Sequence, residues 1–115
     1  MLKINTKTNK NAVIVEIEGD VDLYSSPQVR KIIIDLISKK TPALLINLEG
    51  VNYMDSSGIA TLVEGLQRTK EYGGSLCIYN LQGAVHDVFE LSRLDKVFKI
   101  VDDESEALKA CNDQN

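Results

Sequence analysis

The chain has 115 residues, 43% of them apolar, and a formal net charge of −4 from 17 acidic and 13 basic residues. This length allows one domain with its own hydrophobic core and is too short for two. No segment gathers basic residues, and phosphate neutralisation supplies most of the affinity for duplex nucleic acid, so nucleic acid is not an expected partner. An acidic protein is better matched to a protein with a basic patch.

The sequence carries no signal for a membrane span, for export or for metal binding. No apolar stretch approaches the roughly 20 residues of a membrane span, and the N-terminal MLKINTKTNK lacks the apolar centre of a signal peptide. We therefore expect a cytoplasmic protein without direct membrane insertion. Cys77 and Cys111 belong to no CxxC or Cys/His cluster, so we expect two ordinary buried thiols and no metal site.

The N-terminal part of the chain predicts a β-hairpin followed by a helix. Apolar and polar residues alternate over residues 2–8 and 12–19, and the NKN between them can reverse the chain. Residues 27–40, PQVRKIIIDLISKK, repeat their apolar positions at the spacing of one helical face. Ser25 or Ser26 can cap the first amides of this helix.

The rest of the chain alternates between strand and helix. The run ALLINL is apolar on both faces, as expected for a strand buried inside a sheet. The expected elements are a strand at 43–48, a helix from Ser56 to about Tyr72, a strand at 75–81, a helix at 84–91, a strand at 97–101 and a helix at 104–111. A hairpin followed by this alternation predicts an α/β fold, with one mixed, mostly parallel sheet of about five strands and about four helices.

The turn MDSSG, which opens the helix at Ser56, is the candidate functional site. In open α/β sheets ligands gather at the carboxyl ends of strands, where loops lead into helix N-termini. Asp55 or Ser56 can cap the helix, and Gly58 permits a tight turn or the close approach of another chain. A capped helix alone would explain these residues. The alternative is serine phosphorylation, since a helix N-terminus tolerates a phosphate of about −1.5 to −2 charges.

Three apolar residues flank this turn: Tyr53, Met54 and Ile59. They can belong to the core, or they can be exposed anchors for a protein partner. The sequence leaves both interpretations open. An exposed Ile59 would favour a protein interface over chemistry at this turn.

The sequence offers little support for an enzyme. Ser56 or Ser57 could act as a nucleophile, but there is no G-x-S-x-G, and the only histidine, His86, falls in another helix. Asp20 and Asp22 could form a carboxylate pair, yet no third ligand type stands near them. No phosphate-binding loop is present. We therefore expect a protein that is not an enzyme and has no cofactor, with any ATP bound by its partner.

Four segments resemble, in order and spacing, the STAS domain of bacterial anti-sigma-factor antagonists. They are GDVD at 19–22, VNYMDSSGI at 51–59, the Gly-Gly pair before a strand, and LSRLDKVFKI at 91–100. MDSSG is the most specific of these segments, and the resemblance spans nearly the whole chain. It implies a single STAS domain over residues 1–112, followed by a frayed tail over residues 113–115.

The resemblance also implies a function and a site. Members of this family bind an anti-sigma factor that is also a serine kinase, and so release a sigma factor. The kinase phosphorylates the first serine after the Asp of the turn, and a phosphatase restores it. Carried over to this chain, the phosphoacceptor is Ser56. The partner-binding surface is then expected to comprise Asp22, Leu23, Asp55, Ser57, Gly58 and Ile59.

The chain departs from the family pattern at Ile59-Ala60, where the family often has Leu-Gly. The bulkier Ala60 can alter how closely a partner helix packs there. The stretch IATLVEGLQ is also similar to STAS domains that serve as small subunits of ABC transporters moving lipids. In those proteins the same face docks on the transporter ATPase, and phosphorylation is not required. A transporter subunit is therefore the alternative function.

Overall fold

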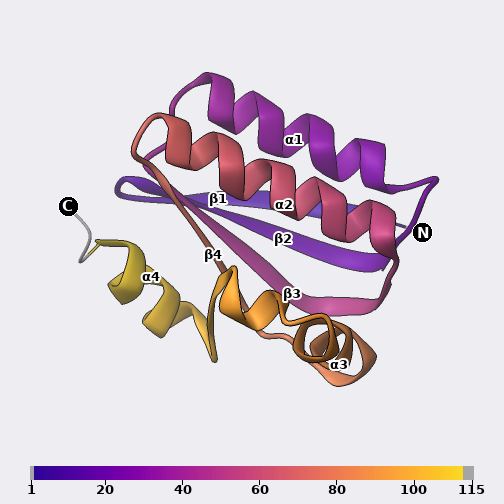
Figure 1. Ribbon diagram of the computed structural model, residues 1–115. Helices are drawn as coiled ribbons and strands as arrows, with labels where there is room; N and C mark the ends of the chain where they lie inside the picture. The colour runs from indigo at the N-terminus through magenta and orange to yellow at the C-terminus, as the bar shows by residue number, and fades with distance from the viewer. Residues whose placement is uncertain (1, 113–115) are drawn as a thin grey trace.

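The computed structural model describes residues 2–112, which form one five-stranded sheet with four α-helices (Figure 1). The elements in chain order are β1 (Lys3–Asn9), β2 (Ala12–Val21), α1 (Ser26–Ser38), β3 (Ala43–Met54), α2 (Ser56–Glu71), β4 (Ser75–Tyr79), α3 (Gly83–Leu91), the 3-10 helix η1 (Leu94–Lys96), β5 (Lys99–Val101) and α4 (Glu104–Asn112). The α/β fold predicted from the sequence is confirmed. The prediction of a frayed tail at 113–115 lies outside the described residues.

The strands lie in the sheet in their chain order, from β1 to β5. β1 pairs antiparallel with β2 through a tight turn at Lys10, which has a φ of 57°, and the other neighbouring pairs are parallel. Because β2 and β3 are parallel, both end at the same edge of the sheet, where Val21 is the register partner of Met54. The loops that follow these two strands therefore start side by side.

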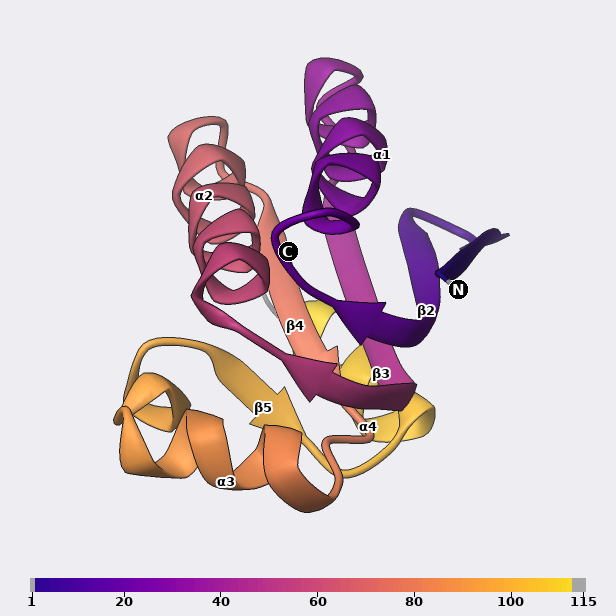
Figure 2. The ribbon, with the colours of Figure 1, turned by 90° about the vertical axis from the view of Figure 1, so that its right-hand side faces the viewer.

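Helices cover the two faces of the sheet unequally (Figure 2). α1 and α2 pack over one face, and α4 packs over the other face against β3, β4 and β5. Along β3, Leu44 and Ile46 belong to the core beneath α1 and α2, whereas Ala43 and Leu45 belong to the core beneath α4. Burial on both faces explains why this strand has an unbroken apolar run.

Several strand boundaries differ from the prediction, among them those of β3 and β5, because backbone pairing continues or stops where apolar alternation does not show it. β3 extends to Met54, since its pairing with β2 continues through irregular steps such as Glu18 opposite Gly50. A Cβ atom at Gly50 would lie 2.7 Å from Cγ of Glu18, so this close approach requires glycine. At the other end of the chain, Leu94–Lys96 forms η1 and leaves only Lys99–Val101 for β5.

No helix within residues 2–112 combines the length and the apolar character needed to span a membrane.

Candidate functional site

Asp55 caps the N-terminus of α2. Its carboxylate oxygen Oδ1 accepts hydrogen bonds from the backbone amides of Ser57 at 2.9 Å and Gly58 at 3.3 Å. Its extended backbone, with φ −100° and ψ −172°, is typical of a residue that precedes a helix. Two amides that lack partners inside the helix are satisfied in this way. Of the two caps that the sequence allowed, the structure therefore selects Asp55.

The same carboxylate also holds the loop that follows β2. Oδ2 of Asp55 accepts a hydrogen bond from the backbone amide of Leu23 at 3.2 Å. The Asp55 amide donates in turn to the carbonyl oxygen of Val21 at 3.1 Å. The GDVD and MDSSG turns, which lie far apart in the sequence, are thus joined at one edge of the sheet.

Asp22 organises the first of these turns. Its Oδ1 accepts hydrogen bonds from the amides of Tyr24 at 2.9 Å and Ser25 at 3.0 Å. The Ser25 amide bond, with help from the Ser25 hydroxyl and the Tyr24 amide, holds the pKa of the Asp22 carboxyl below its usual value of 3.8. Asp22 is therefore a fixed negative charge that shapes the turn.

The expectation that a serine hydroxyl caps α1 is wrong. Ser25 precedes the helix, but its hydroxyl donates to the carbonyl oxygen of Asp20 at 2.8 Å and accepts from the Asp22 amide at 2.9 Å. The first helical amide, of Ser26, instead donates to the carbonyl oxygen of Asp22 at 2.8 Å. The hydroxyl cannot cap the helix because the preceding turn already uses it.

Ser56 is the first residue of α2, and its side chain is exposed. Within residues 2–112 its hydroxyl makes no hydrogen bond, so it is free to react or to meet a partner. Ser57 is half-buried. The helix dipole places partial positive charge at this end of α2. Ser56 is therefore the more accessible hydroxyl of the pair.

Gly58 and Ile59 face inward from the same turn. A Cβ atom at Gly58 would lie 2.7 Å from Cγ of Met54 and 2.8 Å from Cγ1 of Val21. The absence of a side chain thus lets α2 begin in direct contact with the ends of β2 and β3. Ile59 is half-buried and packs against the core beneath α1 and α2. Gly58 and Ile59 therefore pack the turn against the core and do not form its exposed surface.

Two exposed apolar side chains belong to the loop that the Asp55 carboxylate holds beside the start of α2. Leu23 is 64% exposed and Tyr24 is 87% exposed. Together with Asp55 and Ser56 they form what we call the Ser56 face. Tyr53 is also 52% exposed, but it lies within β3 next to the buried Met54, and strand alternation directs it to the opposite side.

Sequence reasoning missed Tyr24. The available signal was an aromatic residue inside a polar turn, outside any strand or helix periodicity, which is where an apolar side chain is left exposed. The other predicted residues of the site lie at the two joined turns: Asp22, Leu23, Asp55, Ser56, Ser57, Gly58 and Ile59.

A family model for the STAS domain matches residues 3–107. The chain belongs to the STAS domain family. The anti-sigma-B factor antagonist of Bacillus subtilis (strain 168) is 32% identical over 99 residues, which are 86% of this chain and 90% of that protein.

Two solved structures share the STAS fold of this chain. An anti-sigma factor antagonist from Mycobacterium paratuberculosis superposes with a TM-score of 0.90, at 21% identity, over 97% of this chain and 95% of that one. The phosphorylated form of the Bacillus cell fate determinant SpoIIAA superposes with a TM-score of 0.73, at 21% identity, over 94% of this chain and 98% of that one. At these identities the structures establish a common fold.

The single histidine of this STAS domain lies in α3, a different helix from the two serines. The His86 imidazole in α3 lies 3.7 Å from Oδ1 of Asp87 and 3.9 Å from Oε2 of Glu90. Within residues 2–112 no hydrogen bond joins it to Ser56 or Ser57, so the geometry forms no nucleophile and base pair. The described residues also contain no group of three or more His, Cys, Asp or Glu side chains that could hold a metal ion.

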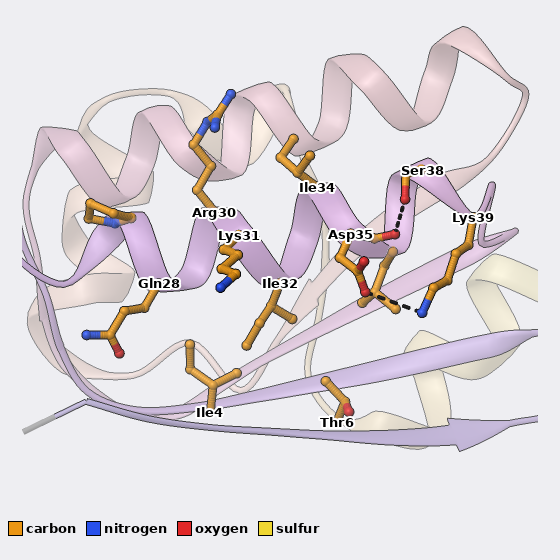
Figure 3. A pocket seen from close by; sticks show the side chains of 12 residues that line it. Ile4, Thr6, Gln28, Arg30, Lys31, Ile32, Ile34, Asp35, Ser38 and Lys39 are labelled. Atoms are coloured by element: carbon orange, nitrogen blue, oxygen red, sulfur yellow. Dashed lines mark hydrogen bonds and ion pairs between the residues drawn. The ribbon is translucent and has the colours of Figure 1, made fainter.

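A groove of about 1200 Å³ runs between α1 and β1 of this STAS domain (Figure 3). Several of its polar side chains pair with neighbours and do not converge on one point. Lys39 lies 3.3 Å from Oδ2 of Asp35, and the Ser38 hydroxyl donates to the Asp35 carbonyl oxygen at 2.6 Å. Arg30 turns toward α2, where its guanidinium bonds both oxygens of Glu64 at 2.7 and 2.8 Å. The arrangement of these side chains therefore does not indicate a small-molecule ligand for the groove.

Proposed function

We propose that this STAS domain is a non-enzymatic, phosphorylation-switched anti-sigma-factor antagonist. In its unmodified form it binds an anti-sigma factor that is also a serine kinase, and that kinase phosphorylates Ser56 and is thereby released. A phosphatase then restores the binding form. The observation that carries the proposal is the exposed, unbonded Ser56 hydroxyl at the first position of α2, directly after the Asp55 carboxylate that holds the Leu23 loop. The antagonist from Bacillus subtilis, as a relative, supports it.

A phosphate on Ser56 would change the surface more than the fold. The helix dipole favours negative charge at this position. The amides of Ser57 and Gly58, however, already donate to Asp55, so a phosphate would gain few hydrogen bonds within the domain. The added charge would remain exposed, next to the Asp55 carboxylate. A partner that contacts Ser56 would therefore meet the full charge of the phosphate.

This charge is expected to prevent binding. A partner that contacts Leu23, Tyr24 and Ser56 together would exclude water from Ser56. Burying a dianion in such an interface carries desolvation and repulsion, and a penalty of ~3 kcal/mol would lower the affinity more than a hundredfold. The domain itself does not have to move for this switch to work.

Intact-mass measurement of the protein from its own cells, followed by fragmentation, tests the modification. We expect one phosphate, located on Ser56. In binding assays with the serine-kinase anti-sigma factors of the same genome, Ser56→Ala should bind and remain unmodified, whereas Ser56→Asp should not bind. Ser57→Ala is the matched control and should be phosphorylated like the unaltered protein.

The opposite result would favour the transporter subunit. If no growth condition yields phosphate on Ser56, and the protein is recovered from its cells with an ABC transporter ATPase and no kinase, the proposed switch is wrong.

A further inference from the structure

β1 is an outer strand of the sheet and is open along one side. Within the described part of the chain it pairs with β2 alone, because the strand order runs from β1 to β5. The open side of an edge strand presents backbone N–H and C=O groups that have no strand partner. β1 is 7 residues long and mostly exposed, whereas β5 at the other edge has only 3 residues. β1 is therefore the edge that is long enough to pair with an added strand.

The groove beside β1 adds apolar surface to this open edge. Ile4 and Thr6 line it from β1, and Ile32 and Leu36 line it from α1. Figure 3 shows the side chains of Ile4 and Ile32 pointing toward one another. Both isoleucines and Leu36 are only half-buried, so each keeps apolar surface in contact with water. Every second side chain of a strand added to β1 would lie over this surface.

The opposite face of β1 is basic. Because Ile4 faces the groove, strand alternation directs Lys3 and Lys7 to the other face. Lys7 lies 3.2 Å from Oε2 of Glu16 on β2, whereas Lys3 forms no ion pair with any residue that the structure describes. The segment KINTKTNK at 3–10 contains three lysines and no acid, although the whole chain has a net charge of −4. The open edge is therefore a basic strip on an acidic protein.

We propose that the edge of β1 and the groove beside it bind an extended segment of a partner protein in which acidic residues alternate with apolar ones. Backbone hydrogen bonds to β1 would add this segment to the sheet as a further strand. Its apolar side chains would lie over Ile4 and Ile32, and its acidic side chains would lie opposite Lys3 and Lys7. The inference goes beyond the proposed function, because none of the residues that line the groove belongs to the Ser56 face.

The charge of β1 argues against a second copy of this chain as the occupant. Two β1 strands placed side by side would bring their lysines together and would supply no acid in exchange. Like charges on neighbouring strands are destabilising, and lysines on an edge strand hinder its pairing with an identical strand. An acidic strand turns this repulsion into attraction. The lysines therefore select the charge of the strand that can be added.

The test uses the peptide EVEVEVE, which carries a fluorophore and has the length of β1. We expect saturable binding to the full chain in fluorescence anisotropy, and weaker binding as salt is added. Hydrogen exchange measured by NMR gives the second readout. In the complex, the β1 amides that do not pair with β2 should exchange more slowly, because they then donate to the peptide. Amides on the Ser56 face should exchange at an unchanged rate.

Three control peptides separate the features of the proposed segment. EEVVVEE keeps the composition but loses the alternation, ESESESE loses the apolar side chains, and KVKVKVK reverses the charge. We expect each of them to bind about tenfold more weakly or less tightly still. Phosphatidylserine vesicles present negative charge without a peptide backbone and should leave the exchange of the β1 amides unchanged.

Lys3→Glu tests the charge of the edge with a matched control. The variant replaces an exposed lysine that has no ion pair, so it should keep its Tm and bind EVEVEVE about fivefold more weakly or less tightly still. Lys96→Glu makes the same change at an exposed lysine of η1 and should stay within about twofold of the unaltered protein.

Several outcomes would overturn the proposal. They are an absence of EVEVEVE binding, equal binding of the control peptides, unchanged exchange of the β1 amides in the complex, and equal losses of affinity in Lys3→Glu and Lys96→Glu. Protection of the same amides by phosphatidylserine vesicles would show that the strip recognises a membrane surface. If the protein alone is a dimer whose β1 amides are already protected, the occupant is a second copy of this chain.

Discussion

The backbone amide of Leu23 donates a hydrogen bond to Oδ2 of Asp55 at 3.2 Å, across 32 positions of sequence. Oδ1 of the same carboxylate caps α2 through Ser57 and Gly58. One side chain therefore sets both the start of the helix that carries Ser56 and the position of the loop beside it. A change at Asp55 should disturb the stability and the partner surface together.

Asp55→Ala tests this double role. Loss of the cap and of the Leu23 bond should lower the free energy of unfolding by about 1–2 kcal/mol. Under the proposed function, displacement of the Leu23 loop should also weaken binding of the anti-sigma factor about tenfold or more. Urea unfolding and a titration with the partner measure the two effects. The matched control is Asp103→Ala, since Oδ1 of Asp103 accepts from the Glu106 amide at 2.9 Å at the start of α4. Equal losses of affinity in both variants would contradict a specific role for Asp55.

Gly58→Ala should destabilise the fold. The new methyl group would have to displace Met54 and Val21, whose side-chain atoms lie 2.7 and 2.8 Å from its position. We expect the free energy of unfolding to fall by about 1–3 kcal/mol, as for overpacked cores. Ser57→Ala is the neighbouring control and should stay within about 0.5 kcal/mol of the unaltered protein. Equal stability of the two variants would show that α2 can shift away from β2 and β3 without penalty.

Asp55 and Gly58 also show how much of the site could be predicted from the sequence. The Asp55 cap could be recognised because local spacing fixes a helix start. For Gly58 the sequence allowed a tight turn or the close approach of another chain, and in the structure it instead lets α2 contact the ends of β2 and β3. The bond from Asp55 to Leu23 could not be recognised from the sequence, because it depends on β2 and β3 being parallel neighbours that end in register at Val21 and Met54.

The dependence on tertiary contacts also explains the other differences between the prediction and the structure. β3 extends beyond its apolar stretch because β2 continues to pair with it. The alternation of residues within one strand does not show how far its neighbour pairs with it. Ser25 has the residue type of a helix cap, but its hydroxyl was taken by Asp20 and Asp22 in the preceding turn. The residue type shows which side chains can form a capping hydrogen bond, and tertiary contacts determine which of them do.

Leu23→Ala and Tyr24→Ala should weaken partner binding without affecting the fold. Both side chains are mostly exposed, so their truncation should change the free energy of unfolding by no more than about 0.5 kcal/mol. If the Ser56 face is the docking surface, each should lower affinity about tenfold or more, because buried aromatic and aliphatic anchors dominate interfaces. Leu91→Ala, at an 85% exposed position in α3, is the control. Weaker binding by the Leu91 variant alone would place the interface on α3.

Acid should loosen the GDVD turn through Asp22. Its folded-state pKa lies below the ordinary value of 3.8, so folding favours the ionised carboxylate. The stabilisation is therefore present above that value and is lost as the pH falls through the folded pKa. Glu64 also has a lowered pKa, because Arg30 hydrogen-bonds it, so a global unfolding curve would mix the two groups. A residue-specific NMR titration of the Asp22 carboxyl carbon and of the Tyr24 and Ser25 amides separates them.

The expected titration has two features. The Asp22 carboxyl should titrate below 3.8, and the amide shifts of Tyr24 and Ser25 should follow the same midpoint, since these amides donate to Oδ1 of Asp22 at 2.9 and 3.0 Å. In Asp22→Asn the two amides should lose this acid transition, because an amide side chain does not titrate. A midpoint at or above 3.8, or an unchanged transition in the Asn variant, would show that Asp22 does not hold the turn.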